Sequence, residues 1–130
     1  MRKLIIAPLL SLMVGFSPNT IAEEAPYTVT NGNEVDEQTF NGFRLHRNFC
    51  ARCHGTFSEG MAGPNLAHSL NRITKEEFVD TVTNGKMGQI GMMPPWSHVP
   101  QVMEGMDAIY SYLRARADGA LGEVRPVRAK

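Results

Sequence analysis

Two cysteines and a histidine stand close together in the segment N-F-C-A-R-C-H-G, residues 48–55. Cys50 and Cys53 are the 2 cysteines of the 130-residue chain, and His54 directly follows the second. Thiols at this spacing can form a redox-active disulfide, supply half of a metal site, or bond covalently to the vinyl groups of a haem. The rest of the sequence has to discriminate between these three kinds of chemistry.

Two of these alternatives lack the sequence context that they need. A thioredoxin-like C-x-x-C motif lies near a βαβ pattern at the start of a helix, whereas here it follows a predicted helix and no strand pattern is visible. A structural zinc site takes four ligands, usually with a second Cys or His pair, and the histidines form no H-x₃₋₅-H pair. We therefore interpret the motif as a haem-attachment site, with Cys50 and Cys53 as thioether donors and His54 as proximal iron ligand.

A methionine is the expected ligand on the opposite side of the iron, because a thioether raises the reduction potential in electron-transfer cytochromes. Met92 and Met93 precede the segment P-P-W, residues 94–96, in a loop well separated from the C-x-x-C-H motif. The prolines stiffen this loop and lower the entropy lost on presenting a sulfur atom. Both methionines are candidates, and His98 is a rival ligand. We expect Trp96 to pack on the porphyrin, with its N–H reaching a propionate or a backbone carbonyl.

Three helices separated by long loops are predicted around this motif. Asp36 is the predicted N-cap of a helix over residues 37–49, which leads directly into C-x-x-C-H. A T-K-E-E capping box predicts a second helix over residues 74–84, ended by Asn-Gly. A third helix is predicted over about residues 100–117, with an apolar stripe formed by Val102, Met106, Ile109 and Leu113. Loops this long need something to organise them, so the sequence predicts an all-α fold in which about three helices surround one covalently attached haem.

The two ends of the chain are predicted to lie outside the helical domain. Residues 1–22 have the pattern of a cleaved secretory signal, with a positive start, a short apolar stretch and an A-x-A-like site at residues 20–22. We expect residues 23–35 to be an extended lead-in, residues 36–117 the haem domain, and residues 118–130 a flexible tail. The apolar stretch is too short to span a bilayer. The protein is therefore expected in a bacterial periplasm, without a stable membrane anchor.

Charge gives no reason to expect nucleic acid as a partner. The full chain has a formal net charge of zero, and removal of Arg2 and Lys3 with the signal leaves −2. Acidic residues concentrate in residues 23–37 and basic residues in residues 114–130. These charged ends are either solvated or form a surface on which another protein docks.

Over most of its mature length the chain resembles the class I c-type cytochromes. The resemblance is carried by Gly42, C-A-R-C-H at 50–54, G-P-N-L at 63–66, N-G-K at 84–86, M-P at 93–94 and Tyr110. It implies that Gly42 lets the first and last helices cross closely, against the turn at residues 109–110. The sequence departs from the family at His46, four residues before the first cysteine, where an aromatic residue is common.

The resemblance also implies the surroundings of the iron. The carbonyl of Pro64 is expected to accept a hydrogen bond from the imidazole of His54, which would fix the ring and tune the iron. The family's axial methionine stands just before a proline, which points to Met93 and leaves Met92 as the alternative.

One segment indicates a subgroup within this family: I-Y-S-Y-L-R-A-R-A-D-G-A-L-G, residues 109–122. It is similar to that of soluble c-550-type cytochromes, which accept electrons from periplasmic PQQ-dependent alcohol dehydrogenases. This implies a monomeric one-electron carrier and not an enzyme, with such a dehydrogenase as donor and a terminal oxidase or another cytochrome as acceptor. Two alternatives stay open: a cytochrome subunit of a larger oxidoreductase complex, and a haem sensor or enzyme with a labile sixth ligand.

Overall fold

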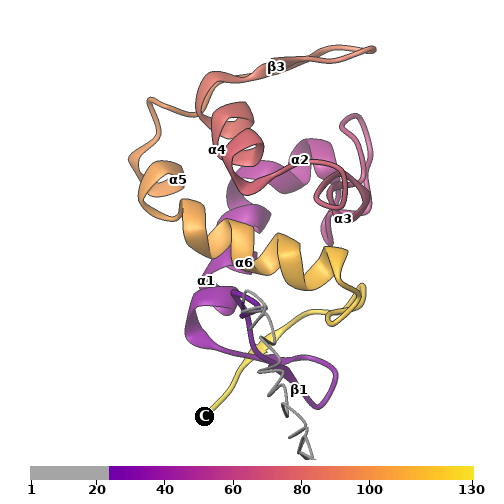
Figure 1. Ribbon diagram of the computed structural model, residues 1–130, viewed down its shortest axis with the longest axis vertical. Coiled ribbons are helices and arrows are strands. Elements are labelled where there is room, and N and C mark those ends of the chain that lie inside the picture. The colour runs from indigo at the N-terminus through magenta and orange to yellow at the C-terminus, as the bar shows by residue number, and fades with distance from the viewer. Residues whose placement is uncertain (1–23) are drawn as a thin grey trace, which may run out of the picture.

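Helices form most of the regular structure of the protein, which confirms the predicted all-α fold class (Figure 1). The computed structural model describes residues 24–130. The predicted signal, residues 1–22, lies outside that part of the chain. The only strands in the described part are two-residue segments, which make one small sheet and one hairpin.

The first helix leads without interruption into the C-x-x-C-H motif. Asp36 is its N-cap, as predicted, and α1 spans Glu37–Leu45. A π-helical segment, η1 (His46–Cys50), follows, and α2 (Ala51–His54) completes the run. The expected end at residue 49 was therefore too early. A π turn widens a helix locally and is frequent at functional sites, but it leaves no signature in hydrophobic periodicity.

Two further helices lie in the middle of the chain. The short α3 (Leu66–Ser69) was not predicted, because four residues are too few to show a helical repeat. The longer α4 (Lys75–Asn84) begins with the predicted capping box: Glu77 N–H donates to Thr74 Oγ1 at 3.2 Å, and Thr74 N–H donates to Glu77 Oε2 at 2.8 Å. It ends at Gly85, whose φ of 76° suits glycine.

The predicted helix over residues 100–117 is divided into α5 (Pro100–Glu104) and α6 (Met106–Ala117). The break lies at Gly105, where a Cβ atom would stand 2.1 Å from Cδ1 of Leu45 on α1. The helix therefore bends at a point where another side chain closely approaches its backbone. The predicted apolar stripe is buried along both pieces, at Val102, Met106, Ile109 and Leu113.

Helices α1 and α6 cross in close contact at Gly42 (Figure 1). A Cβ atom on Gly42 would stand 1.8 Å from the carbonyl oxygen of Ala108 and 3.0 Å from Cβ of Tyr112. The contact was expected at Ile109 and Tyr110, which lie between the two observed positions. Positions 108 and 112 are four residues apart and share the helix face toward α1, whereas Ile109 belongs to the buried stripe.

The two ends of the described chain pair with each other. Strands β1 (Val29–Thr30), β2 (Glu34–Val35) and β5 (Val127–Arg128) form a sheet in the order β1-β2-β5, with β2 antiparallel to β1 and parallel to β5. Residues 118–130 thus differ from the expected flexible tail, and Leu121 within them is fully buried. Strands of two residues show no alternation in sequence, so the pairing is visible only once the helices bring the ends together.

A hairpin projects from the body of the molecule after α4 (Figure 1). Its strands are β3 (Lys86–Met87) and β4 (Met92–Met93), with Lys86 opposite Met93 and Met87 opposite Met92. The sequence predicted a loop here. Within residues 24–130, none of the helices combines the length and apolar character needed to span a membrane.

Candidate haem-attachment site

Cys50 and Cys53 lie on the continuous helical run formed by η1 and α2. Cys50 is half-buried and Cys53 is exposed, and the two do not form a disulfide with each other. Positions three apart on a helix share a face, as attachment to two vinyl groups on one side of a porphyrin requires. Burial, with a smaller effect of Cys53, raises the pKa of the Cys50 thiol to about 12. Residues 24–130 contain no group of three or more His, Cys, Asp or Glu side chains placed to hold a metal ion, so the arrangement that a zinc site would need is absent from them.

The imidazole of His54 is buried and has a fixed orientation. Its exposed fraction is 6%, and Nδ1 donates a hydrogen bond to the carbonyl oxygen of Pro64 at 2.9 Å. This is the contact that the family resemblance implied. An Nδ1–H bound to a carbonyl selects the tautomer in which Nε2 carries the free lone pair, and that nitrogen is then available to a metal.

The loop that carries Pro64 is attached to the motif by backbone hydrogen bonds. Gly63 N–H donates to the carbonyl of Cys53 at 2.7 Å, and Gly60 N–H donates to the carbonyl of His54 at 2.7 Å. A Cβ atom on Gly63 would stand 2.7 Å from Cε1 of the His54 ring. Glycine at position 63 therefore lets the loop backbone lie directly against the imidazole.

The two candidate methionines differ in exposure. Met92 is 62% exposed, whereas Met93 is half-buried and packs against the hydrophobic core. A Cβ atom on Gly85 would stand 2.6 Å from the Met93 carbonyl oxygen, so the base of the hairpin lies tightly on the end of α4. The rival ligand His98 is exposed. These positions favour Met93 over its neighbours as a buried ligand.

Trp96 anchors the segment that follows the hairpin. Its backbone N–H donates to the carbonyl of Val82 on α4 at 3.0 Å. Its ring meets the ring of Phe49 edge to face, with centroids 5.9 Å apart. Because Phe49 directly precedes Cys50, this contact connects the segment after the methionines to the cysteine motif.

His46 is a buried residue of this region whose role the sequence did not indicate. Both His46 and Ser58 have an exposed fraction of 0%, and His46 Nε2 and Ser58 Oγ form a hydrogen bond of 3.1 Å. Burial, followed by the neighbouring charge of His54, lowers the pKa of His46 to about 4. The only signal in the sequence was that a histidine stands where an aromatic residue is common.

These residues fit a covalently bound haem. The paired thiols share a helix face, the adjoining imidazole has one nitrogen free, and a methionine lies on a separate element. Large apolar side chains on the surrounding elements are only half-buried by protein: Phe49, Leu66, Ile73, Val79, Met93 and Trp96. A large apolar group held among these elements would cover such surfaces.

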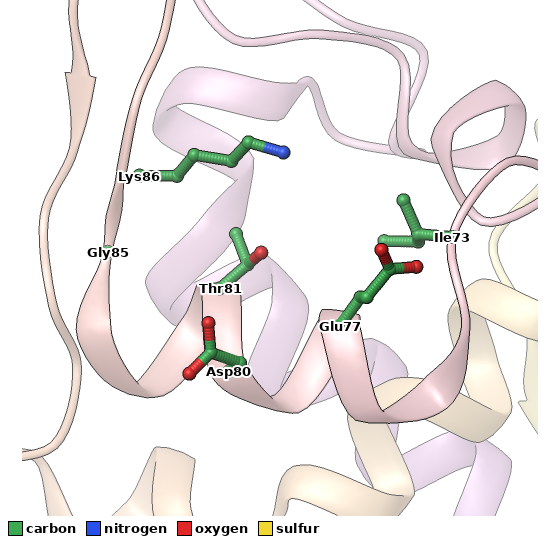
Figure 2. A pocket seen from close by; sticks show the side chains of 6 residues that line it. All are labelled: Ile73, Glu77, Asp80, Thr81, Gly85 and Lys86. Atoms are coloured by element: carbon green, nitrogen blue, oxygen red, sulfur yellow. The ribbon is translucent and has the colours of Figure 1, made fainter.

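A cavity of about 250 Å³ lies along α4 and contains none of the predicted haem residues (Figure 2). It is lined by Ile73, Glu77, Asp80, Thr81, Gly85 and Lys86. Figure 2 shows the side chain of Lys86 extending across the space above Thr81, with the two carboxylates along the helix below. Its lining is mostly polar and charged, so we do not assign it to the haem.

Comparison with known proteins places the chain in a family. The family model described as cytochrome c oxidase, cbb3-type, subunit III matches residues 37–113. Cytochrome c-555 of Methylococcus capsulatus is 38% identical over 89 residues, which make up 67% of this chain and 69% of that protein. Cytochrome c-553I of Paracoccus denitrificans is 32% identical over 114 residues, or 82% of this chain and 50% of that protein.

Solved structures agree with the sequence comparison. The crystal structure of the c-type cytochrome XoxG from Methylobacterium extorquens AM1 has a TM-score of 0.74 and 36% identity, covering 80% of this chain and 67% of that chain. Cytochrome cL from the marine methylotroph Methylophaga aminisulfidivorans has a TM-score of 0.52 at 21% identity, over 73% of this chain and 71% of that chain, which supports the fold alone. The chain therefore belongs to the cytochrome c family: it is an electron carrier with a covalently attached haem c, and Cys50 and Cys53 fit the attachment motif.

Proposed function

We propose that this cytochrome is a periplasmic one-electron carrier whose haem iron is ligated by His54 and Met93. The observation that carries the ligand assignment is the hydrogen bond of 2.9 Å from His54 Nδ1 to Pro64, which leaves Nε2 for the iron. The half-burial of Met93 beside the exposed Met92 supports the second ligand. When bound, the haem supplies reversible one-electron chemistry at iron.

The chain's own residues hold the ligand set rigid. Pro64 and Gly63 confine the His54 ring, and the contact of Gly85 with the Met93 backbone confines the methionine. Ligands held on both sides of a metal leave no open position for a substrate, and little rearrangement accompanies a change of charge. This arrangement suits an electron carrier and disfavours a haem sensor or enzyme with a labile sixth ligand.

The ligand assignment is tested with two neighbouring variants of the haem-loaded protein. Met93→Ala should convert a six-coordinate low-spin visible spectrum to a high-spin one and remove the absorption band of methionine-ligated ferric haem. Met92→Ala is the matched control, because it removes the same atoms from an exposed side chain, and it should leave the spectrum unchanged. The reverse pattern would make Met92 the ligand, and two unchanged spectra would move the ligand to His98 or another residue.

We propose a PQQ-dependent alcohol dehydrogenase as the electron donor and a terminal oxidase or another cytochrome as the acceptor. Support comes from the resemblance at residues 109–122, which form most of α6 and the turn after it. Purified dehydrogenase, alcohol and oxidised cytochrome should together reduce the haem faster than any mixture that lacks one component. Equal rates with and without the dehydrogenase would contradict this pairing.

A second candidate is a subunit of a larger oxidoreductase complex. The description of the matching family model favours this candidate. A relative that is 31% identical, the cbb3-type oxidase subunit CcoP of Rubrivivax gelatinosus, also favours it, although the aligned region covers only 27% of that protein. Size-exclusion chromatography of the native periplasmic fraction separates the two proposals. A free carrier elutes as a small monomer, whereas a subunit elutes with the complex.

A further inference from the structure

Two buried side chains form hydrogen bonds with the loop between α2 and α3. Ser58 of this loop forms the hydrogen bond of 3.1 Å with His46 of η1. Arg116 of α6, which is 9% exposed, donates from Nε to the carbonyl of the adjacent Phe57 at 2.8 Å. The loop is therefore attached to both of the helices that build the core of the fold.

Ser58 adopts a conformation that needs such support. Its φ is 69°, in the left-handed region that non-glycine residues seldom occupy. Its hydroxyl is bound by His46, and its carbonyl accepts the Leu66 N–H at 2.9 Å. A sparsely populated backbone conformation persists when the surrounding structure over-determines it, and here the buried imidazole of His46 supplies a hydrogen bond from the core.

The position of Ser58 is transmitted to the iron-facing histidine through a short chain of contacts. The hydrogen bond from Leu66 to Ser58 closes the loop two residues after Pro64. The carbonyl of Pro64 in turn accepts the hydrogen bond from His54 Nδ1. Displacement of Ser58 would therefore move the acceptor on which the orientation and basicity of the His54 ring depend.

We propose that His46 is a positioning residue for the proximal ligand: through Ser58 it holds the Pro64 carbonyl on His54 Nδ1 and thereby lowers the reduction potential of the haem. This inference rests on the proposed ligation of iron by His54. A strong hydrogen bond gives the imidazole more anionic character, which stabilises Fe(III) relative to Fe(II). Loosening the loop weakens that bond, so the potential rises.

The surroundings of His46 suit a neutral ring with a structural hydrogen bond. Its ring centroid lies 5.2 Å from that of Tyr112, and its Nδ1 atom has no hydrogen-bond partner. The charged or titratable groups that act on it are His54, Glu59, Arg116 and Arg47. The buried ring therefore makes one side-chain hydrogen bond, and that bond goes to the strained loop residue.

The test measures reduction potentials of the haem-loaded protein by spectroelectrochemistry. His46→Phe keeps an aromatic ring but cannot bind Ser58, and Ser58→Gly removes the hydroxyl while tolerating the left-handed φ. Each variant should raise the ratio of reduced to oxidised protein at fixed ambient potential about threefold, or about 28 mV for one electron. The double variant should show the same shift as either single variant, because both act through one bond.

Further variants distinguish a positioning role of His46 from a contribution of its ring to packing alone. His46→Gln retains a side-chain amide that can hydrogen-bond to Ser58 and should restore most of the wild-type potential, together with the NMR shift of the His54 Nδ1 proton. His68→Phe, on an exposed residue of α3, is the control and should change neither quantity. Lowered thermal stability with unchanged potential in both His46→Phe and Ser58→Gly would overturn the proposal. Failure of the Met93 assignment would instead appear as an unchanged visible spectrum in Met93→Ala, which does not depend on the His46 and Ser58 variants.

Discussion

Replacement of Gly42 by alanine tests the crossing of α1 and α6, on which the whole domain is built. The added Cβ atom would stand 1.8 Å from the carbonyl oxygen of Ala108 and 3.0 Å from Cβ of Tyr112. A carbon atom normally approaches a carbonyl oxygen to no less than about 3.3 Å. Neither contact is the flexible end of a side chain, so the backbones of the two helices have to separate. The separation needed is roughly 1.5 Å, the difference between 1.8 Å and the normal limit of about 3.3 Å.

The expected cost follows from two opposing effects. An alanine inside a helix is favoured over glycine by about 1 kcal/mol, which stabilises α1. Overpacking a close contact costs about 1 to 3 kcal/mol, and the required displacement of backbone atoms places this site at the upper end. We therefore expect the free energy of unfolding of Gly42→Ala to fall by about 2 kcal/mol, which corresponds to a drop in Tm of roughly 8 to 16 °C for a domain of this size.

The assay is guanidinium unfolding of the haem-loaded protein, followed by far-UV circular dichroism so that helix loss is measured directly. Gly122→Ala is the matched control, because a Cβ atom at Gly122 would meet nothing within 4 Å. It should change the free energy of unfolding by less than about 0.5 kcal/mol. Equal stability of Gly42→Ala and wild type would refute the reasoning, since the helices would then be free to separate without loss of packing.

Three further predictions concern the site and its supports. Gly63→Ala would place a Cβ atom 2.7 Å from Cε1 of His54 and should reduce the low-spin fraction in the visible spectrum, whereas Gly91→Ala, with open space around its Cβ, should not. Thr74→Ala removes the capping box of α4 and should lower stability by about 1 kcal/mol in guanidinium titration. The pKa of His46 is about 4 in the folded state, below its ordinary value of 6.5, so the unfolded state binds more protons than the folded state between pH 4 and pH 6.5. Its contribution to stability is complete above pH 6.5 and is lost as the pH falls toward 4, by at most about 3 kcal/mol; His46→Phe should show a smaller loss over this range, and an identical pH profile would contradict the assignment.

The features that sequence predicted well are those encoded locally along a helical segment. Asp36 caps α1 through its own side chain, and Thr74 and Glu77 satisfy each other's backbone across three residues. The apolar stripe of α5 and α6 repeats at helical spacing and is buried. Such patterns need no knowledge of the rest of the molecule, because the partners are already adjacent in the chain.

The features that sequence did not predict depend on partners that are distant along the chain. The parallel pairing of β2 with β5 joins residues more than ninety positions apart, and each strand has only two residues. The bend at Gly105 is accompanied by the approach of Leu45 from another helix. In each case the local sequence is compatible with a simpler structure, and tertiary contact decides.

Haem attachment depends on residues that are neighbours in the sequence, whereas the environment of the iron depends on residues that are distant along the chain. Attachment requires two sulfurs and a nitrogen at fixed separations on one helical run, so Cys50, Cys53 and His54 are contiguous and recognisable. The Pro64 carbonyl and the buried hydrogen bond between His46 and Ser58 act from positions that the fold brings together. We therefore expect a substitution at His46 or Ser58 to shift the reduction potential while the residues that bind the haem stay unchanged.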